Sequence, residues 1–151
     1  MKRLSKFDCI LILILILAIV GMVVYRSQHP LSKSNGVLWK GTQDVFFDTE
    51  QEYIAIVGFD KLYFKANQYN QQVNFYNPNL NNCIMNMRLE LADGLLLWDE
   101  PDIYPDYGFY DIDIYETLPV GVYDAVLIVD CYSMDGNQLN GGTVSFKLIV
   151  N

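Results

Sequence analysis

Histidine is almost absent from this 151-residue chain, and its scarcity narrows the chemistry that the protein can perform. The single histidine, His29, stands beside Pro30, close to the N-terminal apolar run. A Ser-His-Asp triad and ordinary histidine-based zinc sites are therefore excluded from the rest of the chain. The sequence also has no C-x-x-C pair, no Walker motif and no glycine-rich phosphate loop. These absences predict that the protein is not an enzyme and uses no metal ion or cofactor; paired carboxylates leave a glycosidase as the alternative.

Basic residues are also scarce. The chain has 10 Lys and Arg against 18 Asp and Glu, a formal net charge of −8, and from residue 27 onward the balance is 17 acids to 6 bases. Such an acidic domain repels nucleic acids and anionic lipid headgroups, so no nucleic acid is expected among its partners. Cations, neutral glycans and basic proteins are compatible with it.

Only one long apolar run is present, and it predicts a membrane anchor. Residues 9–25, CILILILILAIVGMVVY, are 17 residues without a charge. At about 1.5 Å per residue, a helix of this length is at the short end of what crosses a hydrocarbon core ~30 Å thick. A lone strand in lipid would leave its backbone hydrogen bonds unmade, so a helix is predicted. Lys2, Arg3 and Lys6 precede the run and place the N-terminus in the cytoplasm.

This interpretation divides the chain into a cytoplasmic tail (1–8), a transmembrane helix (9–25), a linker (26–36) and an exterior domain (37–151). Pro30 and Gly36 punctuate the linker, which is short and polar. A cleaved signal peptide is the alternative. The apolar run is longer than a usual signal core, however, and no A-x-A-like site follows it, so an uncleaved anchor is favoured.

The exterior part has the pattern of an all-β domain. Segments with alternating or β-rich character recur, with Gly, Pro and Asn between them, and no segment shows a helical period. The predicted strands are EYIAIVGF, KLYFKA, QQVNFYN, CIMNMRLEL, GLLLWD, FYDIDIYE, VYDAVLIVDCY and GTVSFKLIV. Eight short strands at this spacing predict an antiparallel β-sandwich.

Alternation assigns one face of three of these strands to the core. Side chains two residues apart point to the same face of a strand, and in each case one set is more apolar than the other. The predicted inward sets are Cys83, Met85, Met87, Leu89 and Leu91; Tyr123, Ala125, Leu127, Val129 and Cys131; and Val144, Phe146, Leu148 and Val150.

The segment LPVGVYDA carries a resemblance. Leu118, Gly121, Tyr123 and Ala125 match the L-x-x-G-x-Y-x-A form of the tyrosine corner in Ig-like and fibronectin-III-like sandwiches, where the Tyr hydroxyl ties a turn to the following strand. Together with the N-P-x-x-N-x-C strand at 77–83, it resembles small membrane-anchored exterior proteins of Gram-positive bacteria. The resemblance implies an Ig-like envelope domain, in some cases associated with conjugation.

Two cysteines fall on predicted inward faces. Cys83 begins its strand and Cys131 lies near the end of another, so the two meet if those strands run antiparallel. A disulfide is favoured because the exterior is oxidising; two buried free thiols are the alternative.

The stretch DEPDIYPDYGFYDIDIYE, residues 99–116, holds seven acids and no base. Asp111 and Asp113 alternate with isoleucines, which predicts a strand with the acids on its solvent-exposed face and the isoleucines buried. The acids before them, among them Asp102 and Asp106, are assigned to a proline-punctuated loop. Calcium is an alternative, but the D-x-D-x-D-G order of a calcium loop is missing, so no metal site is predicted.

The same stretch is rich in aromatic residues, more than one loop and strand need for a core. Ordinary packing takes some of them. The rest predict an exposed binding surface for a protein partner or, alternatively, for a cell-wall glycan. Its candidate residues are Trp98, Tyr104, Tyr107, Tyr110, Asp102 and Asp106. The expected function is that of an exterior interaction or scaffold module of a bacterial cell-envelope assembly, such as conjugation or secretion machinery, held in the cell membrane through residues 9–25.

Overall fold

Two β-sheets make up the part of the chain that the computed structural model describes, residues 35–41 and 54–151. All of these residues belong to one compact unit, Ser34–Asn151. The strands are β1 (Val37–Leu38), β2 (Lys61–Phe64), β3 (Asn70–Tyr76), β4 (Ile84–Leu91), β5 (Leu96–Ile103), β6 (Tyr107–Asp113), β7 (Gly121–Tyr132) and β8 (Gly142–Val150).

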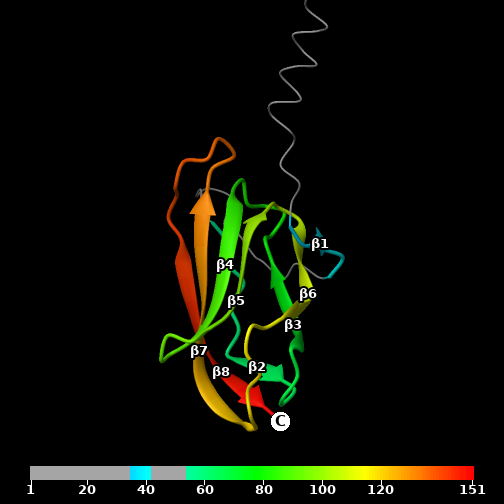
Figure 1. Ribbon diagram of the computed structural model, residues 1–151. Helices are drawn as coiled ribbons and strands as arrows, with labels where there is room; N and C mark the ends of the chain where they lie inside the picture. Colours follow the sequence, from blue (N-terminus) through cyan, green and yellow to red (C-terminus); the bar gives the residue numbers. More distant parts are fainter. Residues whose placement is uncertain (1–34, 42–53) are drawn as a thin grey trace, which may run out of the picture. The chain divides into compact units, whose positions relative to one another are not determined.

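The smaller sheet has the order β1-β6-β3 and the larger one the order β2-β8-β7-β4-β5 (Figure 1). Every pairing is antiparallel except that of β2 with β8, which is parallel. The described residues contain no helix, so the predicted all-β class is confirmed, and the two sheets are consistent with a β-sandwich. The expectation of a purely antiparallel arrangement was wrong for β2, because β2 reaches the outer edge of β8 instead of forming a hairpin with it.

Side chains from both sheets form one core, and the predicted inward faces are confirmed. The β4 set from Cys83 to Leu91 is at most 6% exposed, and the corresponding β7 and β8 residues are buried except for the half-buried Tyr123 and Val144. Aromatic rings link the two sheets. The Trp98 ring of β5 meets Phe109 of β6 edge-on, with ring centroids 5.2 Å apart, and lies 5.7 Å from the ring of Phe75 in β3.

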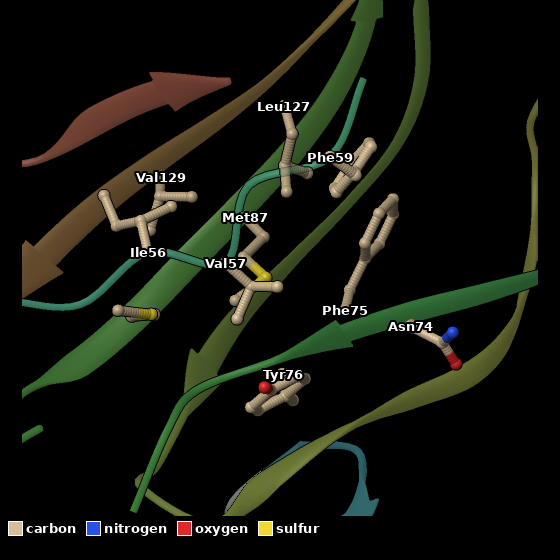
Figure 2. A pocket seen from close by; sticks show the side chains of 10 residues that line it. Ile56, Val57, Phe59, Asn74, Phe75, Tyr76, Met87, Leu127 and Val129 are labelled. Atoms are coloured by element: carbon tan, nitrogen blue, oxygen red, sulfur yellow. The ribbon is translucent and has the colours of Figure 1, made fainter. Parts of the chain in front are cut away.

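The described part of the first predicted strand is not a strand. Of EYIAIVGF, the structure describes Ile54–Phe59, and none of these residues joins a sheet. Instead this bridging segment, Ile54–Asp60, lies over the core between the two sheets, with Ile56, Val57 and Phe59 beside core side chains (Figure 2). The cavity that it encloses there measures about 10 Å³, room for no more than a water molecule.

Two buried asparagines hold this end of the domain together. Asn77 is fully buried and its side-chain nitrogen donates to the carbonyl oxygens of Cys83 (2.8 Å) and Ile103 (2.9 Å). Asn81 is 4% exposed and bonds to both the nitrogen and the oxygen of Ala55, each at 2.8 Å, so it fixes the bridging segment. Asn81 also donates to the side-chain oxygen of Asn77 at 2.9 Å. The NPNLNN turn is therefore a buried polar clasp between four parts of the chain.

The contact expected of a tyrosine corner is present. The hydroxyl of Tyr123 donates to the carbonyl oxygen of Pro119, four residues earlier, at 3.0 Å. Gly121 leaves room for this ring, because a Cβ at Gly121 would lie 3.1 Å from ring atoms of Tyr123. Leu118 is buried and its carbonyl oxygen accepts from the nitrogen of Asn67. The L-x-x-G-x-Y spacing thus serves the turn before β7.

Within residues 35–41 and 54–151 there is no helix long and apolar enough to span a membrane. The predicted transmembrane helix at residues 9–25 lies outside these described ranges, as do the cytoplasmic tail and most of the linker.

Candidate functional site

The acidic, aromatic stretch at residues 99–116 is mostly strand. Asp99, Glu100 and Asp102 belong to β5, which continues through Pro101 to Ile103, so the loop expected there was wrong. A proline is tolerated because β5 is the edge strand of its sheet. The turn itself is only Tyr104–Asp106, and β6 follows at once. The predicted alternation is confirmed from Asp111 in β6 to Ile114, the residue after the strand, with both acids exposed and both isoleucines 3% exposed.

The chain's own N-terminal arm, Asn35–Gly41, docks on this stretch. Asn35 donates through its backbone nitrogen to the carbonyl oxygen of Asp102 (3.0 Å) and through its side chain to that of Pro101 (3.0 Å). β1 then pairs with the start of β6, Val37 opposite Gly108. The Trp39 nitrogen donates to the carbonyl oxygen of Asp106 at 2.8 Å. Backbone groups of the stretch therefore bind the arm like an added strand.

Trp39 anchors the arm by aromatic stacking. Its ring lies between those of Tyr76 in β3 and Tyr110 in β6, with centroids 4.4 Å apart and planes inclined by 13° in both pairs. The side chain is 8% exposed. In addition, the backbone nitrogen of Lys40 donates to the Tyr110 hydroxyl at 2.7 Å. Gly108 of β6 pairs with Tyr76, and a Cβ at this position would come within 2.4 Å of the Tyr76 Cβ.

The six predicted binding residues consequently have different roles. Trp98 is 5% exposed and belongs to the core, so its inclusion in an exposed surface is corrected. Tyr104 and Tyr107 are half-buried, and Tyr107 lies opposite Leu38 of the arm. Asp102 and Asp106 adopt positive φ angles of 57° and 70°, which suits short polar side chains at bends. The sixth residue, Tyr110, is exposed.

Tyr110 lines an open groove at the β3 edge of the smaller sheet. The groove, called here the Tyr63–Tyr110 groove, has a volume of about 580 Å³ and lies between the bridging segment with β2 on one side and β3 on the other. Tyr63 is 58% exposed and Tyr110 39%. Three more exposed side chains line it: Lys61 from β2, and Gln72 and Asn74 from β3. Among its described lining residues there is no carboxylate.

Comparison with known proteins found no matching family model, no matching curated protein and no matching solved structure.

Sequence reasoning selected Tyr110 but missed the other groove residues. Tyr63, Gln72 and Asn74 belong to strands whose sequences show no functional motif. The groove forms only because β2 and the bridging segment lie across from β3. The signal that could have identified them was the spacing of Gln72 and Asn74 in QQVNFYN, which places two amides on the solvent-exposed face of one strand. In the described part of the chain, no three His, Cys, Asp or Glu side chains are grouped so that they could hold a metal ion.

The cysteine pair lies inside the core. Cys83 and Cys131 are 1% and 0% exposed. Cys83 directly precedes β4, and Cys131 lies in β7, the antiparallel neighbour of β4. In the reduced form, a hydrogen bond between the two thiols lowers the pKa of Cys83, and the same bond together with burial raises that of Cys131. The adjacency that the disulfide hypothesis requires is present, and the bond itself stays a prediction.

The acids of β5 predict a pH dependence. Burial, followed by the charge of Asp99, raises the pKa of Glu100 above its ordinary value. The folded state therefore favours the protonated form, and Glu100 lowers the stability of the fold progressively as pH rises from its ordinary pKa through the raised one. The Tyr115 hydroxyl donates to Asp99 at 2.5 Å, a bond that raises the pKa of the tyrosine.

We expect Glu100→Gln to stabilise the domain at neutral pH, because glutamine removes the unfavourable charge beside Asp99. Solvent screening limits the gain to about 0.5 kcal/mol. The gain should fade as pH drops below the ordinary pKa of a glutamate. Thermal unfolding of the full-length chain at a series of pH values checks this, and a gain that does not depend on pH would contradict the electrostatic explanation.

Proposed function

We propose that this chain is a single-pass membrane protein whose exterior Ig-like or fibronectin-III-like β-sandwich is an interaction module of a bacterial cell envelope. The N-terminus is cytoplasmic, the apolar run at residues 9–25 is the anchor, and the domain lies outside. The three basic residues before the run support this orientation, and the Tyr123–Pro119 hydrogen bond supports the Ig-like assignment.

The observation that carries the proposal is the Tyr63–Tyr110 groove. It presents exposed tyrosine and amide side chains from β2, β3 and β6, so a partner would meet recognition groups already held in position by strands. The Asp- and Tyr-rich stretch contributes indirectly, because part of it binds the arm and the arm in turn fixes Tyr110. The domain acts as a scaffold or receptor without chemistry of its own.

Anchoring gives such a module a physical advantage. Confinement to the membrane raises the effective concentration of the domain for neighbouring envelope components, so each contact needs only modest affinity. An acidic exterior with a charge of −11 from residue 27 onward also favours partners with basic or neutral surfaces. Conjugation or secretion machinery is the assembly that the sequence resemblance favours.

Site-specific photo-crosslinking in the native host tests the proposal. A photoreactive amino acid at position 72 or 74 places the reactive group in the groove, and one at position 138 places it in the exposed β7–β8 connection. We expect discrete crosslinked products, identified by mass spectrometry, from the groove positions only. Equal products from position 138, or none from the groove, would contradict a groove-based interaction module.

A carbohydrate binder is the second candidate function. The exposed tyrosines and amides of the groove are the observation that favours it, because this combination suits sugars as well as proteins.

A further inference from the structure

We propose that the Tyr63–Tyr110 groove binds a neutral oligosaccharide. The inference rests on the proposed function, since it names the class of partner that the same groove would take. It starts from geometry: a volume of about 580 Å³ lies within the range of ~300–1,000 Å³ typical of small-molecule sites. The groove is open to solvent, which suits a chain of sugar rings that continues beyond it.

The side chains that line the groove match the two surfaces of a pyranose ring. One surface consists of C–H groups and stacks on an aromatic ring, for which Tyr63 and Tyr110 are available. The rim consists of hydroxyl groups, each both a donor and an acceptor. The amides of Gln72 and Asn74 offer both functions, and Lys61 adds donors.

Tyr110 is fixed before any ligand arrives. One face of its ring is stacked on Trp39 at 4.4 Å, and its hydroxyl accepts the hydrogen bond from Lys40. Trp39 is itself held from the other side by Tyr76. The ring therefore loses little conformational freedom on binding, which matters for sugars because their individual contacts are weak. Gln72 and Asn74 belong to β3, so the strand sets the backbone positions from which their amides extend.

The charge of the groove separates this ligand class from others. A cation site would need carboxylates, and the described residues that line the groove include none. A nucleic acid strand is disfavoured by the acidic domain around the single lysine. A neutral sugar needs no carboxylate ligands and is not repelled by the acidic domain.

Saturation-transfer NMR on the full-length chain tests the inference. The protein is held in a zwitterionic detergent without a sugar headgroup, and the probes are the neutral sugars N,N′,N″-triacetylchitotriose and maltotriose. At ~10 mM sugar, well above a Kd of ~1 mM, we expect transfer to at least one of these probes. Absence of transfer to all of them would overturn the proposal.

Variants locate the site. Gln72→Ala combined with Asn74→Ala removes the amides from exposed positions, and Tyr63→Ala removes an edge-strand ring, so both variants should fold. Each is expected to weaken binding about tenfold or more, a loss typical of a good stacking or hydrogen-bond contact. Tyr69→Ala is the matched control: Tyr69 is 61% exposed and does not line the groove. Equal losses in the control would overturn the assignment to the groove.

The result separates this inference from the proposed function. Protein crosslinks from position 72 without any sugar signal would leave the interaction module intact and refute the saccharide. Sugar binding that the groove variants abolish, together with crosslinks to wall material, would support both. The absence of both signals would refute both proposals.

Discussion

Replacing Asn77 with alanine is expected to lower the free energy of unfolding by about 3–5 kcal/mol, because the change breaks a buried hydrogen-bond network. The alanine leaves the carbonyl oxygens of Cys83 and Ile103 without this donor and leaves the Asn81 amide with one of its two acceptors, the oxygen of Ala55. Each buried polar group left unpaired costs about 1–3 kcal/mol. A domain of this size should lose roughly 10 °C or more in Tm, measured by thermal unfolding of the full-length chain in detergent.

Two further variants isolate the cause. Asn77→Asp keeps the shape of the side chain but places a carboxylate opposite two carbonyl oxygens, so it should be at least as destabilising as alanine at neutral pH. Asn82→Ala changes an exposed asparagine of the same turn and should stay within about 0.5 kcal/mol of the wild type. Similar stabilities for the variants at positions 77 and 82 would show that the clasp does not hold the domain.

Trp39→Ala is expected to cost about 3–5 kcal/mol and to release the N-terminal arm from the domain. The change removes a side chain that is 8% exposed and stacked on two tyrosines. Tyr110 would lose its stacking partner, so saturation transfer to the sugar probes should also fall. Limited proteolysis followed by mass spectrometry, alongside thermal unfolding, should detect cleavage between residues 35 and 41 in the variant only.

Trp39→Phe is the matched control. The indole nitrogen of Trp39 is buried and makes no hydrogen bond, so phenylalanine removes a polar atom that gains nothing in the fold. It keeps a ring between Tyr76 and Tyr110 and should retain most of the stability. An arm that stays protected from proteolysis in Trp39→Ala would contradict the anchoring role of this residue.

Much of the fold was predictable because alternation and turn chemistry are local signals. Met85, Met87 and Leu89 alternate with polar residues, and burial of one face follows directly from the two-residue period of a strand. The Gly121 and Tyr123 pair likewise identified the corner before β7, since the hydroxyl reaches only four residues back.

The errors in the fold concern pairing at a distance. Ile54–Phe59 has the alternation of a strand, and Ile56 and Phe59 do pack on the core, but no neighbouring strand offers it a ladder. Alternation reports burial and says nothing about hydrogen-bonded partners. The parallel pairing of β2 with β8 joins residues more than 80 positions apart, a relation that neither strand encodes locally.

The candidate site was only partly predictable for the same reason. Tyr107 and Asp106 were expected to face a partner, but they contact the chain's own arm. The hydrogen bonds that Asn35 and Lys40 of the arm make to this stretch join residues 66 and 70 positions apart in the sequence. Composition identified a surface that binds something. It could not show that one part of the stretch is occupied intramolecularly while Tyr110 turns toward a groove with residues from β2 and β3.

The exterior location of the domain is tested most directly by labelling a single exposed cysteine in intact cells. Asp93→Cys places a thiol in the exposed turn between β4 and β5, whereas Cys83 and Cys131 are shielded in the fold; Cys9→Ser removes the remaining background. A membrane-impermeant maleimide should label this full-length variant as fully in intact cells as in lysed cells. Labelling that appears only after lysis would place the domain inside the cell and contradict an exterior interaction module.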